Sequence, residues 1–74
     1  MAHRRRIDGR DVAFQAGDGF RWVELAEGYR VRFQRTRGLW EARREETGAR
    51  IAVAASLEDA YRRAQRHYEA LRGH

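Results

Sequence analysis

Apolar and polar residues alternate through residues 29–34, where Tyr29, Val31 and Phe33 take one side of an extended chain and polar residues take the other. This period of two predicts a β-strand with one buried face. The short loop 35–38 ends in a glycine, which can take the positive φ that closes a hairpin. The centre of the chain therefore predicts an antiparallel sheet.

Further strands are predicted on both sides of this one. Residues 39–45 and 50–54 follow it, separated by a turn, while residues 20–25 precede it and residues 12–14 predict a short edge strand. In the two later strands, we expect Trp40, Ala42, Ile51 and Val53 to face inward, and Leu39, Glu41, Arg43, Arg50 and Ala52 to face outward.

The last third of the chain changes to a helical period. Its apolar stripe consists of Leu57, Ala60, Tyr61, Ala64, Tyr68 and Leu71, which span about four turns. Ser56 predicts the N-cap, with Asp59 at the third helical position. Glu58 with Arg62, and Asp59 with Arg63, are spaced as i,i+4 ion pairs.

These elements predict an α+β fold, in which an antiparallel meander of three to four strands carries one C-terminal helix on one face. We expect residues 12–74 to form a single β-β-β-(β)-α domain and residues 1–11 to form a flexible basic arm. Because one helix covers one face of a sheet, the other face is left open. The residues expected on it are Arg30, Arg32, Gln34, Glu41, Arg43 and Arg50.

Composition narrows the classes of function. A chain of 74 residues buries only about 60% of its unfolded surface, and this thin core favours, as a further hypothesis, a homodimer paired through its edge strands. Cysteine is absent and the three histidines are scattered, which argues against disulfides and metal sites. The longest apolar run, 51–55, is too short to cross a membrane, and the N-terminus lacks the apolar stretch of a secretory signal. We expect a soluble, cytoplasmic protein without cofactors.

All 16 basic residues are arginines and the net charge is +5. The preference for arginine over lysine is typical of GC-rich codons and does not itself indicate nucleic-acid binding. The distribution of charge is more informative. Residues 1–10 and 29–50 are strongly basic, whereas residues 11–28 carry four acids against one arginine.

The arginines of the open face predict DNA binding. Guanidinium groups on an antiparallel ribbon can reach guanine edges in the major groove or pair with phosphates, and a basic arm can follow the minor groove or the backbone. The candidate nucleic-acid-binding residues are Arg4, Arg5, Arg6, Arg30, Arg32, Arg35, Arg37, Arg43 and Arg50. The alternative is an ordinary solvated sheet face, in which Glu41 forms cross-strand ion pairs.

A protein-interaction module of the phage-inhibitor or antitoxin type is the second hypothesis, with an acidic protein surface as its partner. Phe20 and Trp22 are its candidate contacts if they are exposed, although Trp22 could equally cover one end of the core. The acidic segment 11–28 favours this hypothesis because it repels DNA. Catalysis is not expected, since Ser56 has no histidine base and His67 has no carboxylate cluster beside it.

The segments Tyr29–Arg35, Gly38–Arg43, Arg50–Val53 and Ser56–Ala64 together resemble the plant ethylene-response-factor DNA-binding domain and the related arm-binding domains of phage and transposon integrases. The resemblance covers residues 29–70. It implies a three-stranded sheet backed by a helix, which reads the major groove through its open face. It also implies that Arg30, Arg32, Arg43 and Arg50 face the groove, and that Arg35 and Arg37 lie near phosphates.

Overall fold

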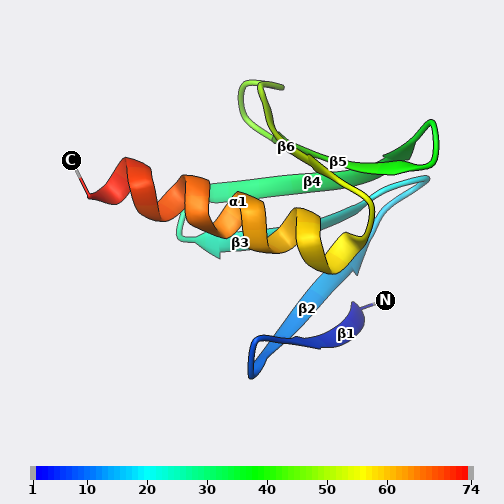
Figure 1. Ribbon diagram of the computed structural model, residues 1–74, viewed down its shortest axis with the longest axis horizontal. Coiled ribbons are helices and arrows are strands. Elements are labelled where there is room, and N and C mark those ends of the chain that lie inside the picture. The colour runs from blue at the N-terminus through cyan, green and yellow to red at the C-terminus, as the bar shows by residue number, and fades with distance from the viewer. Residues whose placement is uncertain (1, 74) are drawn as a thin grey trace.

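The computed structural model describes residues 2–73 and contains one sheet and one helix (Figure 1). The strands are β1 (Ala2–Ile7), β2 (Arg10–Ala16), β3 (Arg21–Ala26), β4 (Tyr29–Thr36), β5 (Leu39–Arg44) and β6 (Arg50–Ala54), and the helix is α1 (Leu57–Arg72). All neighbouring strands pair antiparallel, in chain order. The α+β class and the helix on one face are confirmed, but the sheet has six strands rather than three to four.

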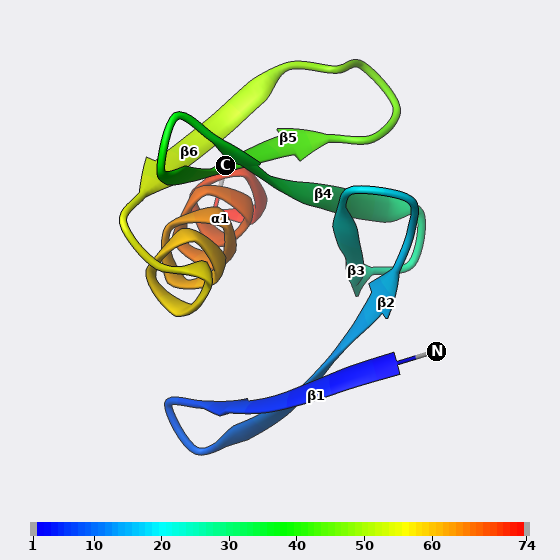
Figure 2. The ribbon, with the colours of Figure 1, turned by 90° about the vertical axis from the view of Figure 1, so that its right-hand side faces the viewer.

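The sheet curves around the helix. Viewed along α1, the strands surround it from β6 and β5 on one side to the β1–β2 hairpin on the opposite side (Figure 2). β2 and β3 share only two register pairs, Gln15 with Trp22 and Ala16 with Arg21. The β1–β2 hairpin therefore diverges from the rest of the sheet and lies on the side of the helix opposite to β5 and β6 (Figure 2). The sheet thus has a concave face that holds α1 and a convex face turned away from it.

Most of residues 1–11, the expected flexible arm, belongs to strands: residues 2–7 form β1, which pairs with residues 10–15 of β2. The prediction is therefore wrong for residues 2–7 and 10–11, and residue 1 lies outside the described residues. The reason is burial: Ile7 is 1% exposed, Val12 is 4% exposed and Phe14 is fully buried. At the turn between the strands, Asp8 and Gly9 take positive φ values of 52° and 79°, as a tight hairpin requires. The apolar side of the hairpin thus joins the core.

The core lies between the concave face and α1. The predicted alternation in β4 is confirmed, with Tyr29, Val31 and Phe33 buried. The Phe14 ring meets Phe33 and Tyr61 edge-on, with centroids 5.6 and 6.0 Å apart. The hairpin, the central sheet and the helix therefore share one aromatic cluster.

The helix begins where the sequence predicts, since the Ser56 hydroxyl accepts a hydrogen bond from the Asp59 N–H at 3.1 Å. Of the apolar stripe, Leu57, Ala60, Tyr61 and Ala64 are buried, but Leu71 is 52% exposed because the last turn extends beyond the sheet. The expected i,i+4 ion pairs are replaced by others. Glu58 pairs with Arg5 of β1, and Arg62 pairs with Asp8 and Asp59.

The pairing of β5 with β6 contains a bulge, which changes the facing of β6. Ala42 pairs with Ala52, but Arg43 pairs with Arg50, so Ile51 is the additional residue. Ala52 therefore lies on the concave face with Ala42, and Val53 lies with Glu41 on the convex face, opposite to the prediction for both. Ile51 packs against the core as expected, and Arg50 still faces outward beside Arg43.

Candidate nucleic-acid interface

Strand register places six of the nine predicted arginines on the convex face. In the centre, Arg32 of β4 is opposite Arg43 of β5, and Arg43 is opposite Arg50 of β6. On the other side, Arg32 is opposite Trp22 and Trp22 is opposite Gln15, which extends the same face into β2. The arginines of the convex face are Arg4, Arg6, Arg30, Arg32, Arg43 and Arg50.

Two glutamates separate the arginines in the centre of this face. Arg43 Nε donates to Glu41 Oε1 at 2.8 Å, and Arg50 Nη1 lies 3.7 Å from Glu41 Oε2. Arg32 Nε donates to Glu45 Oε2 at 3.3 Å. Three like charges on adjacent strands repel one another, so these carboxylates lower the repulsion and hold the guanidinium groups apart.

Glu41 is the most buried charged residue of the face, with 8% of its surface exposed. The hydrogen bond from Arg43, together with the positive charges of Arg43 and Arg50, holds the pKa of Glu41 below its ordinary value of 4.5. Arg43 Nη1 also donates to the Gly48 carbonyl at 2.6 Å. The Arg43 side chain is thus oriented by two partners before any ligand arrives.

Phe20 and Trp22 lie on the convex face, and each ring carries a guanidinium group. The Cζ atom of Arg32 is 3.9 Å from the Phe20 ring centroid, and that of Arg30 is 4.6 Å from the Trp22 centroid. Both rings are half-buried. Trp22 is therefore a partly exposed aromatic residue beneath an arginine, and it does not belong to the cluster around Phe14.

Arg5, unlike its neighbours Arg4 and Arg6, faces the helix. Arg5 Nη1 donates to Glu58 Oε2 at 2.7 Å, at the first turn of α1. The pKa of Glu58 is lowered by a hydrogen bond from its own backbone N–H and by the charge and hydrogen bond of Arg5. Arg5 therefore fastens the hairpin to the helix and is not available on the convex face.

Arg35 and Arg37 also lie outside the convex face. Arg35 is paired with Trp40, on the same side of the sheet as Phe33 and Ala42. Arg37 is exposed at the β4–β5 turn, with a φ of 53°. The structure therefore brings Arg30, Arg32, Arg43 and Arg50 together and leaves Arg35 on the opposite face.

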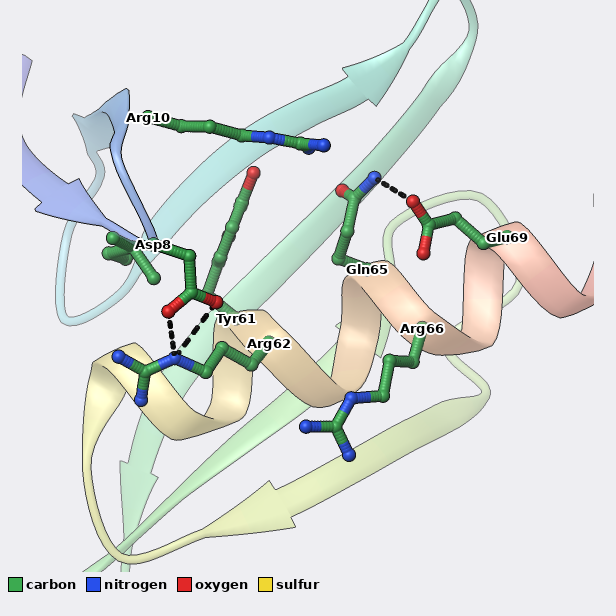
Figure 3. A pocket seen from close by; sticks show the side chains of 8 residues that line it. Asp8, Arg10, Tyr61, Arg62, Gln65, Arg66 and Glu69 are labelled. Carbon is green, nitrogen blue, oxygen red and sulfur yellow. Dashed lines mark hydrogen bonds and ion pairs between the residues drawn. The ribbon is translucent and has the colours of Figure 1, made fainter.

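The hollow between the β1–β2 turn and α1 has a volume of about 250 Å³ and contains both acids and arginines (Figure 3). Arg62 Nε donates to both carboxylate oxygens of Asp8 at 3.0 and 3.2 Å, and these hydrogen bonds raise the pKa of Arg62 above its ordinary value. Gln65 donates to Glu69 at 3.4 Å. Asp8 and Arg62 thus satisfy each other, and their contact holds the hairpin against the helix, while Arg10 and Arg66 of the same hollow form no ion pair within residues 2–73.

Within residues 2–73, no group of three or more His, Cys, Asp or Glu residues is arranged to hold a metal ion. In the same part of the chain, no helix has the length and apolar character needed to cross a membrane. Comparisons with protein-family models, curated proteins and solved structures find no match for this chain. The resemblance to the ethylene-response-factor and integrase domains therefore stays a prediction.

Proposed function

We propose that this protein is a small DNA-binding module of the prokaryotic or phage type, acting in the cytoplasm, and that the convex face is its contact surface. The observation that carries this proposal is the placement of six arginines on that one face by strand register. Four carboxylates share the face, Asp11, Glu24 and Glu41 of the strands and Glu45 beside Arg32, so six arginines leave positive charge in excess. A positive potential on one face attracts the DNA backbone.

The shape of the face supports the same proposal. A convex antiparallel sheet can enter the major groove, where an arginine can donate two hydrogen bonds to guanine. We assign Arg30, Arg32, Arg43 and Arg50 to the groove. Arg4, Arg6 and Arg37, which are exposed in β1 and in the β4–β5 turn, are assigned to phosphates.

The ion pairs on the face do not prevent DNA contacts. The side chains of Arg32, Arg43 and Arg50 retain 37, 42 and 61% of their exposure. Arg32 and Glu45 are both partly exposed, and an exposed pair contributes only about 0–1 kcal/mol, so a phosphate can replace Glu45 as the partner of Arg32. Arg43 and Arg50 can meet DNA through the guanidinium N–H groups that Glu41 does not occupy. Arg30 has no carboxylate partner within residues 2–73, so its charge is free to meet DNA.

Salt dependence tests the proposal. If five or six arginines neutralise phosphates, a plot of log K against log salt concentration should have a slope of about −5. Fluorescence anisotropy with a labelled duplex, from about 50 to 200 mM salt, measures this slope. Absence of binding at low salt, or an affinity independent of salt, contradicts the proposal.

A matched pair of variants locates the contact surface. Arg30→Ala should weaken binding by about 1–3 kcal/mol if Arg30 reads a base edge. Arg63→Ala removes the same charge from the exposed side of α1 and should have little effect. Equal losses in both variants would mean that binding follows net charge alone, without use of the convex face.

The second candidate is a protein-interaction module that binds an acidic protein surface through the same face. The observation that favours it is the presence of apolar side chains among the arginines: Phe20, Trp22, Val53 and Leu39, the last of which is 42% exposed. Large aromatic residues and arginines are typical of interface centres. Size-exclusion chromatography with and without random duplex DNA separates the two candidates, because only a DNA-binding module co-elutes with the duplex.

A further inference from the structure

A second basic feature lies on the other side of the sheet, at the edge of the concave face. It is a hollow of about 350 Å³ between the β2–β3 loop and the facing ends of β4 and β5. Its lining residues are Ala16, Gly17, Gly19, Phe20, Arg21, Arg35 and Trp40. Register places Arg21 opposite Phe33, and Arg35 opposite Trp40, so both arginines are on the concave side of their strands.

Two guanidinium groups converge on the single ring of Trp40. The Cζ atoms of Arg21 and Arg35 lie 5.8 and 5.7 Å from its centroid. Trp40 is half-buried and packs against the core, so the ring is a fixed support for two flexible side chains. Cation–π contacts of this kind orient arginines without neutralising their charge.

No carboxylate lines this hollow. Four other hollows in the described part of the chain each include at least one, namely Asp8, Asp11, Glu45 or Asp59. Neither Arg21 nor Arg35 forms an ion pair within residues 2–73. Asp18 belongs to the adjacent loop but is exposed and does not line the hollow. Two adjacent positive charges thus have no anion of their own.

We propose that this hollow binds a phosphate group. Guanidinium forks match the oxygens of a phosphate and can donate two hydrogen bonds each. A dianion between Arg21 and Arg35 also removes the mutual repulsion of the two cations. Gly19 leaves its side of the β2–β3 loop open to a ligand of this size, since even a β-carbon added there would meet no atom within 4 Å.

The phosphate site is separate from the convex face, so it does not depend on the proposed DNA binding. Phe20 alone is common to both, because its ring lies beneath Arg32 and also lines the hollow. The phosphate could belong to a free nucleotide or to the end of a nucleic-acid strand. Both sources present the same terminal phosphate to the arginines.

NMR titration of the full-length protein tests the site. The probes are inorganic phosphate, adenosine monophosphate, and one short oligonucleotide with and without a 5′-phosphate. We expect saturable shifts of the Trp40 indole N–H and of the Arg21 and Arg35 Nε–H signals. If inorganic phosphate and the mononucleotide saturate these signals, the phosphate belongs to a free ligand. If only the 5′-phosphorylated strand saturates them, the phosphate belongs to the end of a strand. Either result supports the site.

Variants distinguish this site from general attraction of anions. Arg21→Gln and Arg35→Gln should each raise Kd about tenfold or more, because each removes a bidentate donor. Arg63→Gln makes the same change of net charge on the exposed side of α1 and should leave Kd unchanged. A backbone amide spectrum of each variant confirms that it is folded. The proposal is overturned if no probe saturates these signals below about 10 mM, or if all three variants bind alike.

Discussion

Ile7→Ala is the most direct test of the way the N-terminal hairpin is packed. Ile7 is 1% exposed, although it stands in the polar segment Ala2–Ile7. Removing a buried isoleucine side chain down to alanine costs about 2–5 kcal/mol, from the lost burial and the cavity left behind. The same substitution in a flexible arm would change stability by no more than about 0.5 kcal/mol.

The loss is large relative to the stability of so small a chain. At about 0.05–0.15 kcal/mol per residue, 74 residues have a free energy of unfolding of about 4–11 kcal/mol. Ile7→Ala therefore removes a large share of it, and Tm should fall by roughly 10–30 °C. Because this variant could be too unstable to analyse, Ile7→Val serves as a milder change with an expected loss of about 0.5–1.5 kcal/mol.

Urea unfolding followed by circular dichroism measures both losses. Arg6→Ala is the matched control, since Arg6 is the exposed neighbour in the same strand and has only a long 3.9 Å ion pair with Asp11. It should shift the free energy of unfolding by less than about 0.5 kcal/mol. If Ile7→Ala unfolds at the same urea concentration as Arg6→Ala, the burial of the hairpin is refuted.

Three further predictions concern the N-cap of α1, the pH dependence due to Glu41 and Glu58, and the ion pair between Arg5 and Glu58. Ser56→Ala should lose about 1 kcal/mol of stability, because Ser56 is the N-cap of α1; an unchanged thermal midpoint would contradict the cap. Glu41 and Glu58 have folded-state pKa values below 4.5, so near that pH the unfolded chain binds more protons than the folded chain. The contribution of the two carboxylates to the free energy of unfolding is therefore complete above that pH. It is lost as pH falls through the folded values, and a urea midpoint that stays flat from pH 7 to pH 3 would refute this. In Glu58→Gln the midpoint should fall less over that range, and amide exchange in β1 should become faster at neutral pH as the Arg5 ion pair is lost.

The elements with a strong local period are predictable from sequence. In β4, Tyr29, Val31 and Phe33 alternate with polar residues, and in α1 an apolar stripe follows a capping serine, so local chemistry alone indicates both elements. The central arginines of the convex face are predictable by the same reasoning. Arg30, Arg32 and Arg43 alternate with core residues and are therefore placed on the side away from the helix.

The hairpin was not predictable in this way, because β1 contains one large apolar residue in a run of arginines. A basic run has the composition of a disordered arm, and only pairing with β2 and burial of Ile7 make it a strand. The bulge in β6 is equally invisible locally, since Arg50–Ala54 reads as an ordinary alternating strand. A bulge depends on the partner strand, and it moves the side chain of every later residue in the bulged strand to the opposite face of the sheet.

By itself, therefore, the sequence determined the α+β class, the capped C-terminal helix and the set of central arginines that face away from it, because these follow from the period of neighbouring residues. The tertiary structure decided the number of strands, the facing of β6 and the separation of Arg5 and Arg35 from the other arginines. Those features depend on contacts between residues far apart in the chain. Arg5 and Glu58, for example, are 53 positions apart, and only the folded chain makes them neighbours.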